Sequence, residues 1–233
     1  MFSSTVMGHW LPAAAGDLAE GEGVVVIDPE LPENRSVSVL EVEDGPTVVR
    51  LSPGRAAHLG HAHGERIAAD EATERITAAG IALNNPDHLF YLPVEEHASV
   101  LAESADEHTR RLSEEDADTF AALAAAAPEN DLDEAFVELD HWLVFGTFVE
   151  GRLAAAASMF PWRGTRLADL GVITLPEFRG RGLARATVLA MAAEALEQGY
   201  EPQYRCQLDN APSVALALAS GFRRFGEWSV IDD

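Results

Sequence analysis

The 233-residue sequence predicts an α/β protein with a mixed sheet, divided into an N-terminal α/β domain at residues 1–105 and a C-terminal domain at residues 106–233. Short runs rich in β-branched residues alternate along the chain with segments in which apolar residues recur at helical spacing. The pattern restarts after residues 104–107, so we expect the domain boundary near residue 105. An apolar content of 47% is sufficient for a buried core.

Strands and helices are both predicted in the N-terminal part. Three runs separated by Pro, Gly, Asn and Asp are predicted strands, at Gly23–Asp28, Val37–Val42 and Thr47–Leu51. Residues Gly64–Gly80 carry apolar side chains at the spacing of one helix face, and Gly80 would end that helix. Residues Asn84–Pro93 are predicted to form a turn and a short strand, and Glu95–Ser104 a further helix.

The C-terminal part is predicted to follow the order β α α β β β α β α β. Its first helix starts after Ser113, where Asp116 completes a capping box, and ends before Pro128. The other elements are strands at Thr109–Leu112, at 142–160 around a Glu150-Gly151 turn, at Arg166–Leu175 and at Tyr204–Leu208, and helices at Leu132–Leu139, Leu183–Gln198 and Ala211–Ser220. The last strand follows Gly221.

The chain is strongly acidic, with 39 Asp and Glu residues against 16 basic residues, all of which are Arg. The net charge of −23 disfavours nucleic acid and anionic membranes as partners. Residues 160–226 differ from the rest, because they contain eight Arg and six acidic residues, a balance of +2, whereas the remainder carries −25. A polyanionic ligand would therefore bind in this segment.

The stretch LPEFRGRGLARATVLAMAAEALEQG, at residues 175–199, places glycines and arginines directly before an apolar helix. The N-terminus of a helix carries backbone N–H groups without partners in the helix and a partial positive charge. Gly180 and Gly182 have no side chain that would keep an anion away from these groups, and three nearby Arg residues add positive charge. We therefore expect a phosphate group to bind at this helix entrance.

Two familiar phosphate-binding patterns do not fit this entrance, since the chain contains no Lys for a Walker loop and Arg185 replaces the third glycine of a dinucleotide fingerprint. Arg179, Gly182 and Ala184 do fit the pattern Arg/Gln-x-x-Gly-x-Gly/Ala, which together with the preceding LGVITLP resembles motif A of the GNAT superfamily of acyl-CoA N-acyltransferases. The downstream stretch LDNAPSVALALASGF resembles the second signature of that superfamily. The resemblance covers roughly the C-terminal half and implies a GNAT fold there.

The resemblance implies acetyl-CoA, or a related acyl-CoA, as the cofactor. Its pyrophosphate would bind the amides of the helix entrance, its pantetheine arm would pair with an open strand edge, and the backbone N–H of Val172 would polarise the thioester carbonyl. The implied cofactor-binding residues are Val172, Ile173, Thr174, Arg179, Gly180, Arg181, Gly182, Leu183, Ala184, Arg185, Asn210 and Ser213. The implied reaction is direct attack of an amine on the thioester, which requires that the amine lose a proton.

The usual catalytic groups of the superfamily are not found at their usual positions. Ala168 occupies the position of the carboxylate, eleven residues before the first Arg of the motif. Asp169 is adjacent and is our predicted catalytic residue, although strand alternation points it to the other face unless a bulge intervenes. Ala217 occupies the position of the tyrosine that often protonates the departing thiolate, so Tyr204, Cys206 or a water molecule would replace it.

Two further sets of residues allow more than one interpretation. His58, His61, His63 and Glu65 lie within eight residues of sequence, but we interpret this segment as a solvated glycine-containing loop and expect no metal site. For Cys206, buried packing competes with a role as an acid or acyl acceptor.

The predicted second helix and its exit carry Glu134, Glu138, His141 and Trp142, in a region that shapes the acceptor pocket in the superfamily. They form either the acidic solvent face of an amphipathic helix or an acidic pocket for a cationic amine. The N-terminal domain would cover the acceptor side, form a degenerate second copy of the fold, or mediate dimerisation.

The sequence thus predicts an N-acetyltransferase that transfers an acetyl or other short acyl group from acyl-CoA to a small-molecule or peptide amine. The alternative is a non-catalytic acyl-CoA-binding sensor or interaction protein, because alanine occupies both usual catalytic positions. No nucleic-acid or membrane partner is expected, and a homodimer stays open. With no signal peptide, no long apolar stretch and a single cysteine, we expect a cytoplasmic protein without an internal disulfide.

Overall fold

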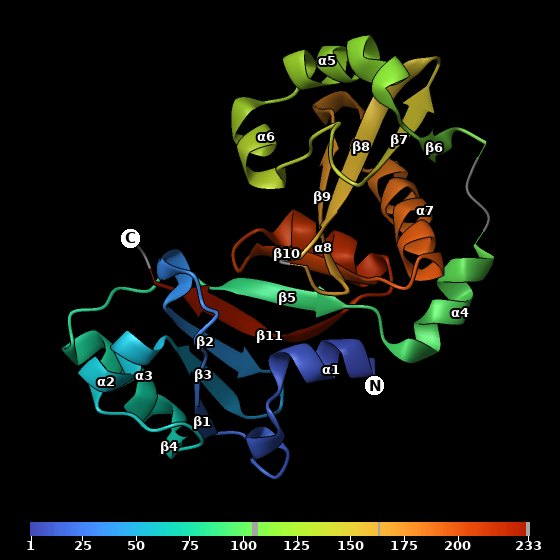
Figure 1. The fold of residues 1–233 in the computed structure, drawn as a ribbon. Coiled ribbons are helices and arrows are strands. Elements are labelled where there is room, and N and C mark those ends of the chain that lie inside the picture. Colours follow the sequence, from blue (N-terminus) through green and yellow to red (C-terminus); the bar gives the residue numbers. More distant parts are fainter. Residues whose placement is uncertain (104–106, 163, 232–233) are drawn as a thin grey trace. The chain divides into compact units, whose positions relative to one another are not determined.

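The computed structural model describes residues 1–103, 107–162 and 164–231 and has a mixed α/β fold (Figure 1). The chain forms two compact units. The first unit consists of residues 1–5, 91–205 and 211–223, and the second unit of residues 6–90, 206–210 and those from 224 onward. The predicted boundary between residues 105 and 106 lies outside the described residues and stays a prediction.

The strands of the second unit follow the order β4-β1-β3-β2-β11-β5. They are β1 (Glu22–Ile27), β2 (Val37–Val42), β3 (Thr47–Leu51), β4 (Arg66–Ala68), β5 (Asp87–Tyr91) and β11 (Arg223–Val230). Strands β1 and β3 are parallel, whereas β2 is antiparallel to both β3 and β11. Helices α2 (Pro53–Leu59) and α3 (Ala69–Ala78) contact these strands over a core of buried Val, Leu and Ile side chains. The predicted strands of the N-terminal part are confirmed.

The predicted helix at Gly64–Gly80 is wrong at its start. Residues Arg66–Ala68 form β4 instead, and α3 begins only at Ala69. The cause is Ile67, which lies opposite Gly23 of β1 and is buried in the sheet, although its position also fits the apolar face of a helix. The sheet therefore uses an apolar residue that the sequence pattern assigned to the helix.

Sequence analysis also missed α1 (Ser4–Trp10) and α2. Helix α2 has ordinary signals at both ends. Ser52 accepts a hydrogen bond from the backbone N–H of Arg55, Pro53 occupies the first turn, and Gly60 follows the last turn in the left-handed conformation. These signals were sufficient to predict the helix.

The strands of the first unit follow the order β10-β9-β8-β7-β6. They are β6 (Thr109–Arg111), β7 (Leu143–Val149), β8 (Arg152–Pro161), β9 (Leu167–Thr174) and β10 (Glu201–Gln207), and β10 alone among them is parallel to its neighbour. Helix α7 (Leu183–Glu197) packs against β6 to β9, and α4 (Val94–Ala102) and α8 (Ala211–Ala219) contact α7. Helices α5 (Ala117–Ala126) and α6 (Glu129–Ala135) contact β8 and β9. The order predicted from Thr109 onward is confirmed.

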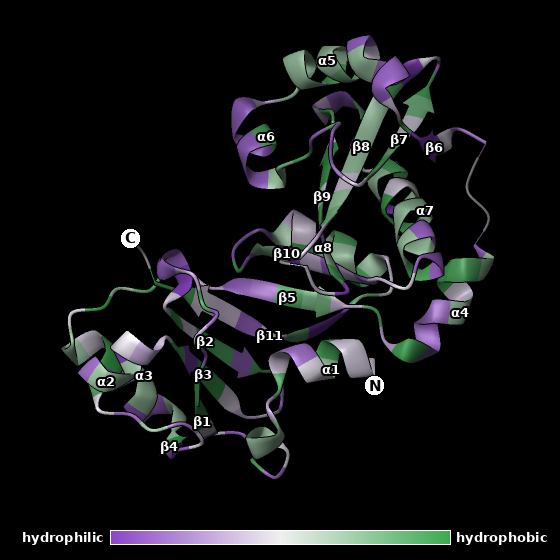
Figure 2. Ribbon diagram, in the orientation of Figure 1, coloured by the Kyte–Doolittle hydropathy of each residue, from purple (hydrophilic) through white to green (hydrophobic). Residues whose placement is uncertain are grey.

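Two faces of these strands are distinguished by their contacts. On one face, the side chain of Thr147 on β7 reaches Thr187 of α7. On the other face, Ala156 and Ile173 share a core with Leu123 of α5. Figure 2 shows that β8, which lies between β7 and β9, is mainly hydrophobic, whereas α6 is mainly hydrophilic. The alanines of β8 at 154–157 are fully buried. Because their side chains are small, helices can pack closely on both faces of this strand.

The start of α5 confirms the predicted capping box. The side chain of Ser113 caps the 3-10 turn η3 (Glu114–Asp116), and Asp116 reciprocates, before α5 continues. The helix predicted at Leu132–Leu139 is wrong in its position, since α6 spans Glu129–Ala135. Pro128 starts α6, and Phe136 ends it with a φ of 45°. In the described part of the chain, no helix is long and apolar enough to cross a lipid bilayer.

Candidate functional site

Strands β9 and β10 diverge halfway along β9. They pair from Leu167 with Glu201 to Leu170 with Tyr204, and among the described residues their pairing goes no further. Strand β8, in contrast, pairs with β9 up to Thr174. Residues 171–174 therefore have an open backbone edge on the side away from β8. Val172, Ile173 and Thr174, which we predicted to offer such an edge, lie in this stretch.

The entrance of α7 follows β9 after the 3-10 turn η4 (Pro176–Phe178). Gly180 and Gly182 have φ values of 71° and 80°, which side chains other than glycine rarely adopt. A Cβ atom at either glycine would meet no other atom within 4 Å. Across the described residues, the backbone N–H groups of 180–185, which include Leu183 and Ala184, have no hydrogen-bond acceptor, and the first paired N–H is that of Ala186.

The three arginines at this entrance differ in their partners. Arg179 donates to the carbonyl at the end of β9 at 3.1 Å and pairs with Asp131 of α6. Arg185 donates to the last carbonyl of α8 at 2.9 Å and pairs with Glu103 at 3.0 Å. Arg181 is exposed and, among the described residues, pairs with no carboxylate. Arg181 is therefore the residue best placed to offer its charge to an anion.

A chain of buried hydroxyl groups fixes the first turn of α7. Thr187 donates to the carbonyl of Leu183 at 2.8 Å. Because its proton is used there, Thr187 accepts from Thr147 of β7 at 2.7 Å, and Thr147 accepts from Thr109 of β6 at 2.8 Å. The chain connects two strands to the turn that carries the unpaired N–H groups.

Asp169 is 4% exposed, and its carboxylate is held by neighbours on β10. Arg205 donates to it at 2.8 Å and Gln203 at 2.9 Å, while Tyr91 donates to the side chain of Gln203. The β8–β9 register has no bulge, so Asp169 lies opposite Phe160 and on the same face of β9 as Ile173, away from α7. These contacts favour a role in joining β9 to β10, and catalysis by Asp169 stays a prediction.

The other predicted catalytic positions lie on β9, β10 and α8. Ala168 and Ala217 are fully buried. The hydroxyl of Tyr204 shares a hydrogen bond of 2.8 Å with the hydroxyl of Ser213, in the first turn of α8. Asn210 and Cys206 belong to the second unit.

A cluster on the α6 side of β8, which we call the His141 cluster, consists of Phe136, Glu138, His141, Ser158 and Phe160. His141 Nδ1 and Ser158 Oγ share a hydrogen bond of 2.8 Å, and the backbone N–H of Glu138 donates to the same oxygen at 3.2 Å. The carboxylate of Glu138 lies 3.6 Å from His141 Nε2. Sequence analysis singled out Glu138 and His141 but missed Ser158.

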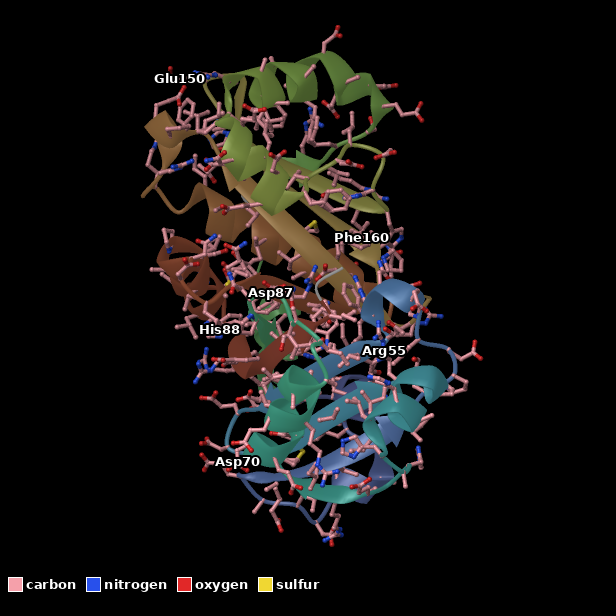
Figure 3. The ribbon with its side chains drawn as sticks, turned by 90° about the vertical axis from the view of Figure 1, so that its left-hand side faces the viewer. Arg55, Asp70, Asp87, His88, Glu150 and Phe160 are labelled. Atoms are coloured by element: carbon pink, nitrogen blue, oxygen red, sulfur yellow. The ribbon has the colours of Figure 1, made fainter. Side chains whose placement is uncertain are left out.

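Two aromatic rings flank His141, and both were missed by sequence analysis. The ring centres of Phe136 and Phe160 lie 5.1 and 4.9 Å from that of His141, and Phe160 is labelled in Figure 3. Phe136 is 54% exposed, so one side of its ring is open to solvent.

Gly171 holds the end of α6 close to β9. A Cβ atom at this position would lie 1.7 Å from the carbonyl oxygen of Ala135, so only glycine fits. A glycine inside a predicted strand is a known signal of close backbone approach, and it was available in the sequence. Phe136 follows Ala135 directly in the chain. The close contact between Ala135 and Gly171 therefore holds Phe136 near the start of the open edge of β9.

The histidine-rich segment of the second unit is held by hydrogen bonds. His61 lies 3.1 Å from the carboxylate of Glu65, and His63 accepts from the backbone N–H of Ile27 at 3.1 Å. Within the described ranges, no group of three or more His, Cys, Asp or Glu side chains is arranged to hold a metal ion.

Comparisons with known proteins agree on one family. A family model described as GNAT acetyltransferase matches residues 91–231. Uncharacterized N-acetyltransferase YdfB of Bacillus subtilis (strain 168) is 34% identical over 67 residues, which are 29% of this chain and 26% of the relative. The solved structure of an acetyltransferase from the GNAT family of Colwellia psychrerythraea is 21% identical, with a TM-score of 0.50, and the match covers 65% of this chain and 57% of that one. This chain thus spans about a quarter of the curated relative that it matches.

Proposed function

We propose that this chain, which belongs to the GNAT acetyltransferase family, transfers an acetyl group from acetyl-CoA to a small-molecule or peptide amine. The family generally uses acetyl-CoA as its cosubstrate and amines as acceptors. One observation carries the proposal: unpaired N–H groups at the entrance of α7 lie next along the chain to the open edge of β9.

The residues of the entrance fit a coenzyme A diphosphate. The N–H groups of residues 180–185 would donate to its oxygens, and Gly180 and Gly182 leave the space in front of these groups open. Arg181 would add a charge-assisted hydrogen bond. Arg179 and Arg185 would act indirectly, by holding the loop through Asp131 and Glu103.

The open edge of β9 fits the peptide-like pantetheine arm. The backbone groups of Val172, Ile173 and Thr174 would pair with its amides as an added strand would. The N–H of Val172 would donate to the thioester oxygen, where negative charge develops during attack. Tyr204 lies where β9 and β10 diverge, and its hydroxyl group would donate a proton to the departing sulfur. The hydrogen bond with Ser213 would hold this hydroxyl group in place. Asn210 remains a predicted cofactor contact.

Calorimetry with coenzyme A tests the binding site. In Gly182→Glu, a carboxylate would occupy the mouth of α7, and we expect the affinity to fall at least about tenfold because of like-charge repulsion. Gly199→Glu is the matched control, since Gly199 is also a left-handed glycine with open space around it, at the other end of α7. Equal affinities in wild type and Gly182→Glu would contradict the proposed site.

Turnover distinguishes acetyl transfer from the sensor alternative. The wild-type protein is incubated with acetyl-CoA and a panel of primary amines, namely phenethylamine, putrescine and a peptide with a free N-terminus, while thiol release is followed. We expect thiol release that depends on the amine. Coenzyme A binding without turnover would support a sensor instead.

A further inference from the structure

We infer that His141 is the general base that takes the proton of the acceptor amine. The inference rests on the proposed function, because it assigns a residue to that reaction. Sequence comparison with motif A offers no carboxylate for this step, since Ala168 stands at its position and is fully buried. The His141 cluster supplies an imidazole ring beside the open edge of β9, from the segment between α6 and β7.

The β8–β9 register places His141 at the reacting end of the site. Its partner Ser158 lies directly opposite Gly171 on β9. Residues opposite each other in an antiparallel pair have neighbouring Cβ positions about 5 Å apart. Gly171 is followed by Val172, whose N–H is proposed to contact the thioester oxygen. His141 therefore lies beside the start of the open edge, on the face of β9 away from α7.

The inference assigns the role of the base to Nε2 of His141. The Ser158 oxygen accepts from the backbone N–H of Glu138 and shares a hydrogen bond of 2.8 Å with Nδ1 of His141, in which the donor depends on the tautomer of the ring. With its proton on Nδ1, the neutral ring presents Nε2 as a proton acceptor. The contact with Ser158 holds the orientation of the ring, and in this tautomer Ser158 accepts from Nδ1–H.

The surroundings of the ring suit a cationic amine. Glu138 places a half-exposed carboxylate 3.6 Å from Nε2, where it would attract an ammonium group and then stabilise the imidazolium. The rings of Phe136 and Phe160 add favourable cation–π contacts. The charged pair nearest along the same face, Asp169 with Arg205, is mutually neutralised.

The proton steps balance as follows. An ammonium group gives one proton to Nε2 of His141, and the neutral amine attacks the thioester carbon, so that the C–N bond forms while an electron pair moves to the oxygen beside Val172. When this pair returns, the C–S bond breaks and Tyr204 donates its proton to the sulfur, while the second proton of the nitrogen restores the Tyr204 hydroxyl. The products are the amide and a free thiol, and His141 releases its proton to water.

Kinetics of His141→Gln test the inference, with His108→Gln as the matched control, because His108 is an exposed residue outside the cluster. We expect kcat for the amine panel to fall about 100- to 10,000-fold in His141→Gln. The KM for acetyl-CoA and the calorimetric affinity for coenzyme A stay unchanged. The pH dependence of kcat/KM is expected to differ between His141→Gln and the wild type. His108→Gln retains all four properties.

Two further measurements cover the case in which His141→Gln fails to fold. In wild-type protein with labelled histidine rings and bound coenzyme A, addition of phenethylamine is expected to shift the His141 resonance and not that of His108. In His141→Ala, added imidazole is expected to restore part of the rate, because it enters the space left between Phe136 and Phe160.

The outcomes separate the two proposals. If His141→Gln retains the turnover and pH profile of the wild type, His141 is not the base and acetyl transfer stands. If imidazole gives no rescue and the amine shifts no ring resonance, the assignment is also wrong. If the wild type binds coenzyme A but acetylates none of the amines, both the transfer and the base are overturned.

Discussion

The hydroxyl chain of Thr109, Thr147 and Thr187 shows how single residues stabilise the start of α7. Each hydroxyl group donates to the next oxygen in the chain: Thr109 to Thr147, Thr147 to Thr187, and Thr187 to the carbonyl of Leu183. Thr187 is fully buried, so any group left without a partner would also be shielded from water. The chain holds the turn whose N–H groups are proposed to bind the diphosphate.

Removal of the last hydroxyl of this chain should therefore cost stability. We expect Thr187→Val to lower the free energy of unfolding by about 1–3 kcal/mol, because the buried hydroxyl of Thr147 loses its acceptor while the shape is preserved. Urea denaturation measures the change. Thr73→Val is the control, since Thr73 lies exposed on α3 and should change stability by less than about 0.5 kcal/mol. A Thr187→Val protein as stable as the wild type would show that the chain contributes nothing.

At the scale of elements, the start of α5 depends on one carboxylate. Asp116 accepts from the backbone N–H of Ser113 at 3.0 Å and from Arg110 at 2.6 Å. The hydrogen bond from the Arg110 guanidinium lowers the pKa of Asp116 below its usual value. A carboxyl group whose pKa is lower in the folded state stabilises the fold above the pKa of the unfolded chain. That contribution is lost as the pH falls through the folded pKa.

We therefore expect Asp116→Asn to destabilise the protein by about 1–2 kcal/mol at pH 7, because the capping box and the ion pair are both lost. The difference from the wild type should shrink as the pH falls below about 4, where the carboxyl group becomes protonated in the unfolded chain and then, at lower pH, in the folded protein. Chemical denaturation between pH 7 and pH 3 measures it, with the exposed Glu115→Gln as the control. A difference as large at pH 3 as at pH 7 would contradict the assignment.

The local sequence pattern predicts correctly those elements whose apolar spacing fits only one kind of secondary structure. The strands β1 to β3 and the helix α7 were predicted closely, as was the order of elements after Thr109. The pattern failed at Ile67, where a sheet position and a helix face compete for the same apolar residue. It failed again around α6, because the left-handed Phe136 ends the helix early without a glycine.

The site was predicted to the extent that it is built from consecutive residues. The two glycines of the α7 entrance lie next to the N–H groups that they expose, so the sequence is sufficient. His141 and Ser158 meet only because β8 returns antiparallel to β7 and because α6 ends above Gly171. That meeting depends on register and on helix ends, which a single sequence does not determine.

At the scale of the whole molecule, the chain passes between the two units at five places, after residues 5, 90, 205, 210 and 223. The first unit therefore includes Tyr91, which is fully buried and donates to Gln203, and α4, which packs against α7. Both precede the domain boundary predicted from the sequence.

A fragment of residues 106–233 should consequently fail to fold as a unit. We expect it to lack the sigmoidal thermal transition of the full chain in circular dichroism, because Tyr91 and α4 are missing from its core. The full-length protein serves as the reference. A fragment with a cooperative transition at the same temperature would show instead that the C-terminal part folds independently.

The alternation of the chain between units has a consequence for biosynthesis. Because α8 completes the first unit and β11, directly after it, completes the second, neither unit can close until the ribosome has synthesised the chain as far as α8 and β11. Nascent chains should thus stay open to proteases and chaperones until β11 has been synthesised, unlike proteins whose N-terminal domain folds while later residues are still being added.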